Sequence, residues 1–300
     1  MEGRVRDDPW DSVSLAFTNP QLDDEFWRHR VVQTLCRYDL MIYLYGVLHW
    51  ASLFLTLRPP PDTPVYVWVL AYPVLMFLEL AAVCSSFHRL KQYVEWRTCI
   101  VAVIRVCAIL VTSITLYAPP GKTPLAAMAR LLSQTPVAAS VIFGCGLQLP
   151  FRLHVAVQFL SCTVAMLFVP SYVKAWELQG EALAGACRSV GGTVDWALRA
   201  LVWVGPAEAG EEGLRDRCSC CLVMYFLQWV VGFVAPSAFI YCVESYSRKD
   251  YIFEHGRLTR KERRTVRRAW RRAVPSAMLC AVIGAVTLWE LLKATSMPAS

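Results

Sequence analysis

Two charged side chains, Glu79 and Arg105, lie inside apolar stretches of this sequence, where they could bind an ion or a polar solute. Glu79 is near the end of the stretch 65–84, and Arg105 is near the start of the stretch 99–117. At the helical rise per residue they would lie about 7 and 10 Å below a membrane surface. Consecutive antiparallel helices would bring them together, so an ion pair is predicted. Ionisable groups at such depth mark functional sites, and a purely structural pair is the alternative.

Two neutral polar side chains, His49 and Gln228, fall near the middle of other apolar stretches. We expect them to link helices by hydrogen bonds, with a ligand role as the alternative for His49. The five histidines are at least 20 residues apart and no HExxH motif is present, which excludes the familiar histidine metal motifs. Because no nucleophile and base stand at a recognisable spacing, we predict no catalytic residue, no bound metal and no cofactor.

Four cysteines belong to the long segment 174–217 or follow it directly: Cys187, Cys218, Cys220 and Cys221. If this segment faces an oxidising compartment, a disulfide from Cys187 to one of the other three is expected. A metal site in the Cys-Ser-Cys-Cys cluster is the alternative, although a second spaced pair is missing.

The most basic part of the chain is the segment 244–272, which has 11 Lys or Arg against 4 acids. Thr259 and Glu262 have the spacing of a capping box, so a helix should begin near residue 260. Its basic face would meet anionic lipid headgroups, with Trp270 at the membrane interface. That face consists of Arg260, Arg263, Arg264, Arg267, Arg268 and Arg271. A basic loop that serves only as a topology signal is the alternative.

The composition is typical of an integral membrane protein. Of 300 residues, 56% are hydrophobic and 18% charged, and the mean hydropathy is +0.40. Seven stretches are near the length of about 20 residues that a helix needs to cross a membrane. They are 39–57, 65–84, 99–117, 131–149, 153–173, 218–243 and 273–293. The sequence therefore predicts an all-α, polytopic helical bundle with seven membrane-spanning helices.

The basic segment sets the predicted topology, because short loops rich in Lys and Arg stay in the cytoplasm. With seven spans the N-terminus is then cytoplasmic, and the segment 174–217 faces outward. An apolar piece within it, 194–204, is short for a span and is expected at the interface. If this piece crossed, the N-terminus would lie outside. The predicted parts are an N-terminal segment (1–38), a membrane domain (39–293) and a short tail (294–300).

Short signals predict where helices begin and where they are interrupted. Asn19-Pro20 followed by acids predicts a helix from Pro20, amphipathic and lying on the membrane surface before the first span. A second surface helix is expected before the last span. Gly191-Gly192 predicts a break, and 85–98 a loop. Prolines interrupt three predicted spans and leave carbonyls that a side chain or ligand could use. They are Pro73, Pro136 and Pro236.

Two functional classes fit these predictions. The first is passage of an ion or solute, or sensing of a ligand, through a bundle lined by Glu79, Arg105, His49 and Gln228. The second is a membrane-embedded scaffold whose basic segment binds anionic lipid or an acidic partner. The expected partners are the lipid bilayer, its anionic headgroups, and a second copy or another membrane protein, but not nucleic acid. A cavity shared by the polar residues favours the first class, and a solidly packed bundle favours the second.

Overall fold

The protein is described by a computed structural model for residues 15–17, 19–57, 90–114, 135–177, 181–202, 218–255, 275–276 and 278–292. Every regular element in these ranges is a helix, so the predicted all-α class is confirmed. In chain order they are α1 (Pro20–Arg30), η1 (Val31–Leu35), α2 (Cys36–Leu57), α4 (Leu90–Ile114), α6 (Pro136–Gly146), α7 (Phe151–Glu177), α8 (Glu181–Val202), α9 (Cys218–Trp229), η4 (Val230–Val234), α10 (Ala235–His255) and the helix Met278–Leu292. The predicted span 65–84, with Pro73, lies outside the described residues.

The first helix begins where the sequence predicts. Asn19 Oδ1 accepts a hydrogen bond from the backbone N–H of Gln21 at 3.0 Å, and Pro20 is the first helical residue. The helix continues from α1 through the π-helical turn η1 into α2, so the predicted surface helix and first span are one continuous element. Phe26 and Arg30 of α1 are buried, and the ring of Phe26 packs against Tyr251 of α10.

A second long helix consists of α9, the π-helical turn η4 and α10. It continues to His255, beyond the predicted end at 243, so the predicted basic loop 244–272 starts as a buried helix and not as a loop. Pro236 has no N–H for the carbonyl of Gly232 one turn earlier. The side-chain amide of Gln158 donates to that carbonyl instead. The predicted use of a proline-freed carbonyl by a neighbouring side chain is confirmed at this position.

Two predicted interruptions are wrong because tertiary contacts extend the helices. α4 begins at Leu90, inside the predicted loop 85–98, and its first turns bury Tyr93 and Arg97 against polar partners. α8 continues through Gly191 and Gly192. A Cβ atom at Gly191 would lie 3.2 Å from Cγ2 of Val223, so this glycine lets α8 approach α9 closely.

Two further boundaries differ from prediction. The span predicted at 131–149 is helical only over Pro136–Gly146 among its described residues. Pro136 does not interrupt this helix but begins it, at the position where a missing N–H has no cost. In the predicted outer segment 174–217, α7 continues to Glu177 and α8 occupies Glu181–Val202. The piece 194–204 is therefore not separate, because its described part belongs to α8.

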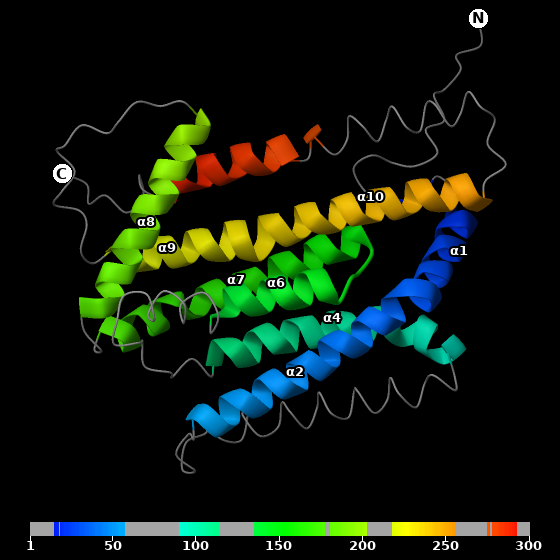
Figure 1. Cartoon of the computed structure of the whole chain (residues 1–300), viewed down its shortest axis with the longest axis horizontal. Coiled ribbons are helices and arrows are strands. Elements are labelled where there is room, and N and C mark those ends of the chain that lie inside the picture. The colour runs from blue at the N-terminus through cyan, green and yellow to red at the C-terminus, as the bar shows by residue number, and fades with distance from the viewer. Residues whose placement is uncertain are drawn as a thin grey trace, which may run out of the picture.

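The helices form a bundle in which α7 packs against both α4 and α9 (Figure 1). α6 lies beside α7 and contacts η4 and α10, while α8 crosses one end of the bundle next to α9. The helix Met278–Leu292 joins this end through Trp289, whose Nε1 donates to Asp195 Oδ1 at 3.0 Å. At the other end α1 meets the C-terminal part of α10.

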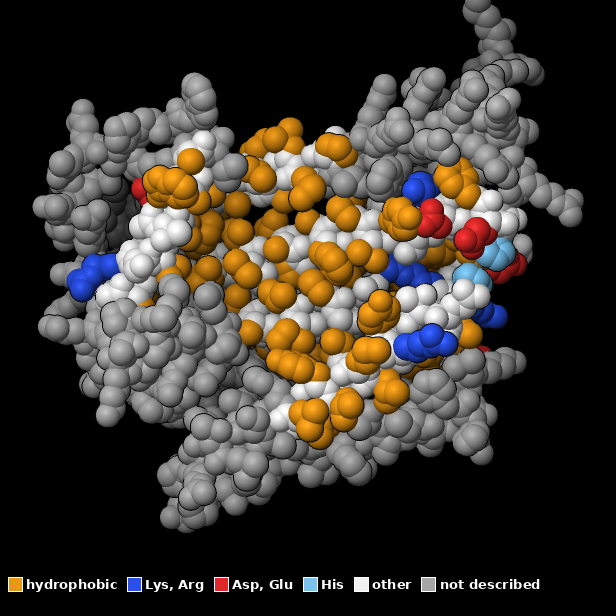
Figure 2. Space-filling view, in the orientation of Figure 1, with side chains coloured by type: hydrophobic (Ala, Val, Ile, Leu, Met, Phe, Trp, Pro, Cys, Tyr) orange, Lys and Arg blue, Asp and Glu red, His pale blue; other side chains and the backbone are white. Residues whose placement is uncertain are grey.

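One face of the bundle is apolar along its middle. Figure 2 shows hydrophobic side chains over the centre of one face, and charged side chains mainly toward its ends. Large apolar residues such as Met41, Leu48 and Leu167 are 63%, 61% and 74% exposed. Two helical segments in the described part, Phe151–Ser171 and Cys220–His255, are long and apolar enough to cross a membrane. Pro136–Gly146 and Met278–Leu292 are shorter apolar helices.

Candidate functional site

A buried guanidinium, Arg105 of α4, lies inside the bundle with neutral partners. Arg105 is 1% exposed, and its Nη1 donates to Nδ1 of His154 at 3.1 Å. Its Nη2 donates to Oε1 of Gln158. Because arginine is only a donor, Nδ1 of His154 must accept, which leaves the proton on Nε2. Ser237 Oγ lies 3.4 Å from that Nε2 and is placed to accept it. Within the described part of the chain, the hydrogen-bond partners of Arg105 thus carry no negative charge.

The same network reaches Gln228, the second predicted residue that the structure describes. Gln158 Nε2 donates to the backbone carbonyl of Ser140 at 3.1 Å. Gln228 Nε2 donates to Oγ of Ser140 at 2.9 Å and lies 3.3 Å from Sγ of Cys162. Ser140 therefore joins the two glutamines. We call the group Arg105, His154, Gln158, Ser140, Gln228, Cys162 and Ser237 the central polar network.

Two glycines leave the space that the glutamine side chains occupy. A Cβ atom at Gly144 would lie 3.0 Å from Oε1 of Gln158. At Gly232 it would lie 2.8 Å from Nε2 of Gln228. Since both glutamines are buried and hydrogen-bonded, α6 and η4 need these glycines for the central polar network to close.

A bidentate ion pair anchors one end of the bundle. Asp39 of α2 accepts from Nε and Nη2 of Arg97 at 2.6 and 2.7 Å, and from the Tyr93 hydroxyl at 2.6 Å. Asp39 is 0% and Arg97 1% exposed. Burial, together with the adjacent Asp39 carboxylate, raises the pKa of Tyr93, which keeps its hydroxyl protonated as a donor. Arg97 Nη1 also donates to the carbonyl of Gln148 at 2.8 Å, which ties α2 and α4 to the segment before α7.

A second ion pair at this end joins the two long helices. Arg248 Nε donates to Glu244 Oε1 at 2.9 Å, and its Nη1 donates to Asp23 at the start of α1. The other oxygen of Glu244 accepts from the backbone N–H of Phe151 at 2.9 Å, at the N-terminus of α7. The Arg248 guanidinium lies 4.5 Å from the ring centroid of Phe26. Two carboxylates and an aromatic ring therefore compensate this buried charge.

The remaining predicted site residues are placed as follows. Glu79 lies outside the described residues, as do the six arginines of the predicted basic face and Trp270. His49 belongs to α2, but its side chain is not among those described. The predicted Glu79–Arg105 pair thus stays a prediction. Within the described ranges, no three His, Cys, Asp or Glu side chains are grouped to hold a metal ion.

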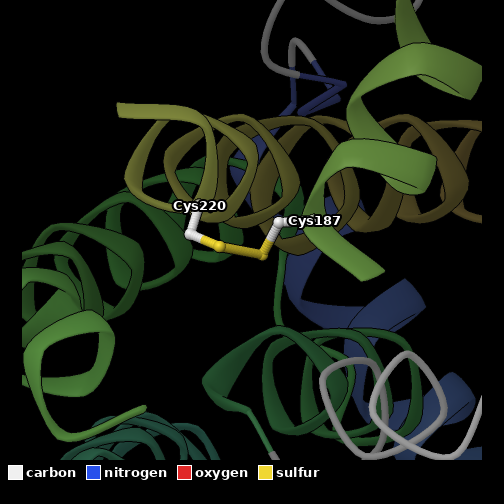
Figure 3. The surroundings of a disulfide bond; sticks show 2 residues. All are labelled: Cys187 and Cys220. Atoms are coloured by element: carbon white, nitrogen blue, oxygen red, sulfur yellow. A yellow bond between two sulfur atoms is a disulfide. The ribbon is translucent and has the colours of Figure 1, made fainter. Parts of the chain in front are cut away.

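Of the four predicted cysteines, Cys187 of α8 and Cys220 of α9 form a disulfide (Figure 3). Their Cα atoms are 5.2 Å apart, and the two residues are 33 positions apart in the sequence. Cys187 is fully buried and Cys220 is 8% exposed. The other two predicted cysteines also belong to α9: Cys218 is its first residue, and Cys221 comes directly after the bridged Cys220. The bridge fastens α8 across the end of the bundle.

The candidate-site residues absent from the sequence predictions are mainly His154 and Gln158. Together with Cys162 they recur every four residues, which places them on one face of α7. This polar stripe in an otherwise apolar helix was the available signal. Three other buried charges gave no such signal, because charged residues are common at the ends of membrane spans. They are Asp39, Arg97 and Glu244, which lie at or near predicted span ends.

The chain was compared with protein-family models, with curated proteins and with solved structures. None of the three comparisons gives a match.

Proposed function

We propose that the chain is a multi-pass membrane protein that recognises a small anionic solute at Arg105, for passage through the bundle or for sensing. The proposed protein has seven spans and a cytoplasmic N-terminus. Its apolar middle surface and its two helices of spanning length support a place in the bilayer. The observation that carries the function is that the buried guanidinium of Arg105 has only neutral hydrogen-bond partners among the described residues.

The energetics favour a functional role for this charge. Placing a guanidinium in an apolar interior costs several kcal/mol unless a counter-charge is present. His154 and Gln158 satisfy hydrogen bonds but supply no negative charge. A bound anion would supply this negative charge. The amide and hydroxyl groups of the central polar network can reorient to donate hydrogen bonds to the anion as it binds. Beside α4, the network draws residues from α6, α7 and the continuous helix of α9, η4 and α10, so a solute there would contact several helices.

The test is anion uptake by proteoliposomes that contain the purified full chain, with chloride, nitrate, phosphate and acetate as probes. Arg105→Gln should reduce uptake or binding about tenfold or more, because a charge-assisted contact is lost. The exposed Arg37 on α2 provides the control, and Arg37→Gln should behave as wild type. Equal uptake by wild type and Arg105→Gln for all four probes would contradict the proposal.

The predicted Glu79–Arg105 ion pair offers a competing explanation for the same charge. If Glu79 is the counter-charge, Glu79→Gln and Arg105→Gln should lower the thermal stability equally. The exchanged double variant, Glu79→Arg with Arg105→Glu, should then recover part of the loss. Such recovery would show that Arg105 has a structural role as the ion-pair partner of Glu79 and would contradict the anion-binding role. If Arg105 instead serves a bound anion, Glu79→Gln and Arg105→Gln should differ in their effect on thermal stability and the exchanged double variant should recover nothing.

A scaffold function is the second candidate, and the basic sequence 260–272 favours it. A peptide covering residues 256–273 should become helical on vesicles with anionic lipid, at about 1 kcal/mol per arginine before screening. Neutral vesicles should have no effect, and salt should reverse the binding. Circular dichroism measures both. Equal binding to neutral vesicles would leave the segment as a topology signal only.

A further inference from the structure

A groove of about 680 Å³ separates the N-terminal helix from α10. One wall is formed by α1, η1 and α2, the other by α10, and residues of α6 and the link after it line the floor. The volume is in the range of small-molecule sites. Tyr38 on one wall and Tyr246 on the other are 50% and 51% exposed, so the groove opens on the surface of the bundle. It is distinct from the central polar network, which contributes no residue to its lining.

Both walls of the groove are apolar at the same end and polar at the other end. Along α10 the lining runs from Phe239 and Val243 to Asp250 and Glu254. The opposite wall runs antiparallel, from Ile42 and Tyr38 to Arg30 and His29. The polar ends coincide, since the ring of His29 lies 5.0 Å from that of His255. The 15 helical rises from Phe239 to Glu254 span about 22 Å, which is close to the thickness of one bilayer leaflet with its headgroups.

The polar end holds a buried cation with spare hydrogen-bonding capacity. Arg30 is 6% exposed, and its Nη2 donates to Oε1 of Gln148 at 2.6 Å. Its Nη1 has no hydrogen-bond partner among the described residues. Glu244 is the carboxylate that acts on Arg30 through its charge, and it is itself paired with Arg248. Burial lowers the pKa of Arg30 to about 10, so it remains charged at neutral pH. A buried donor of this kind needs an acceptor.

Two acids line the polar end of the groove on the other wall. Asp250 and Glu254 lie one turn apart on α10, and both line the groove. Asp250 is 40% exposed and lies 3.6 Å from Lys249 Nζ, so these acids form the outer rim while Arg30 lies deeper. His29 is the other titratable side chain of the Arg30 wall at this end. A purely anionic ligand would be attracted by Arg30 and repelled by the two acids.

We propose that this groove binds one zwitterionic phospholipid from the surrounding leaflet. Its phosphate lies against the Arg30 guanidinium, whose side chain turns to present the closed-off Nη1 to the groove, and its amine lies toward Asp250 and Glu254. The acyl chains lie over Tyr38, Ile42, Phe239 and Val243. This arrangement satisfies the unpaired donor, matches both signs of charge at the polar end, and covers the apolar end with hydrocarbon.

The test uses native mass spectrometry of the delipidated full chain in detergent micelles. Phosphatidylethanolamine, phosphatidylglycerol and diacylglycerol with identical acyl chains are offered in equal amounts. We expect one phosphatidylethanolamine to bind about tenfold or more strongly than either other lipid, because it alone makes both charged contacts. Glycerophosphoethanolamine, which has the headgroup without acyl chains, should not compete. Competition by it would place the binding in the headgroup alone and overturn the proposal.

Variants separate the two ends of the groove. Arg30→Gln should lower phosphatidylethanolamine binding about tenfold, whereas Arg28→Gln, at an exposed position on the same helix, should not change it. The double variant Asp250→Asn with Glu254→Gln should shift the preference toward phosphatidylglycerol. If Arg30→Gln does not fold, Val243→Trp tests the apolar end by filling it. Unchanged lipid binding in folded Arg30→Gln, or in Val243→Trp, would overturn the proposal.

Discussion

Asp39→Asn is expected to lower the free energy of unfolding by about 3–5 kcal/mol, the usual cost of removing one partner from a buried ion pair. The carboxylate accepts three hydrogen bonds, two from Arg97 and one from Tyr93, and neither member of the ion pair is more than 1% exposed. The amide leaves the guanidinium of Arg97 buried without its counter-charge. Unfolding of the detergent-solubilised protein, followed by circular dichroism against denaturant, measures the loss.

Two further variants show whether the loss comes from the ion pair. Asp24→Asn removes a carboxylate at an exposed position of α1 and should change the stability by less than about 0.5 kcal/mol. Asp39→Leu combined with Arg97→Met replaces both charges by apolar groups and should recover much of the loss. Equal stability of Asp39→Asn and Asp24→Asn would show that the pair does not hold α2 to α4.

Cys187→Ala is expected to lower the free energy of unfolding by about 2–4 kcal/mol. The bridge to Cys220 closes a loop of 33 positions, and it joins α8 to the long helix that starts with α9. Without it the unfolded chain gains the freedom of that loop, and α8 loses its covalent contact at the bundle end. A thermal unfolding scan without reductant gives the comparison with wild type.

The exposed Cys280 supplies the matched control, because it forms no disulfide with any described residue. Cys280→Ala should unfold as wild type does. Reductant should lower the stability of wild type to that of Cys187→Ala and leave the variant unchanged. If the non-reduced wild type reacts fully with an alkylating reagent at Cys187 after unfolding, the bridge does not form in solution and the expected loss will not appear.

Local features of the fold could be predicted from the sequence because they depend on neighbouring residues. The start of α1 follows from the Asn19 side chain and the fixed φ of Pro20. The free carbonyl of Gly232 follows from the missing N–H of Pro236. The apolar helices follow from long runs without charge. Each of these acts within one or two helical turns, so no knowledge of the tertiary arrangement is needed.

Part of the candidate site was also accessible from sequence. Arg105 and Gln228 stand out because a polar group in an apolar stretch must find a partner or a function. The identity of the partner was not accessible. Arg105 meets His154, 49 positions away, and Gln228 meets Ser140, 88 positions away. Which polar groups meet depends on the rotation and neighbours of each helix, and apolar faces of similar composition leave several arrangements open.

The tertiary structure decided which charges are buried and which helices continue. Arg248 belongs to the most basic segment of the sequence, yet it is buried between Glu244 and Asp23, the latter 225 positions away. Gly191 predicts a break by its weak helix propensity, yet it remains helical because the missing Cβ admits Val223. In both cases the outcome depends on a partner far away in the sequence, which supplies the counter-charge for Arg248 and the close helix contact for Gly191.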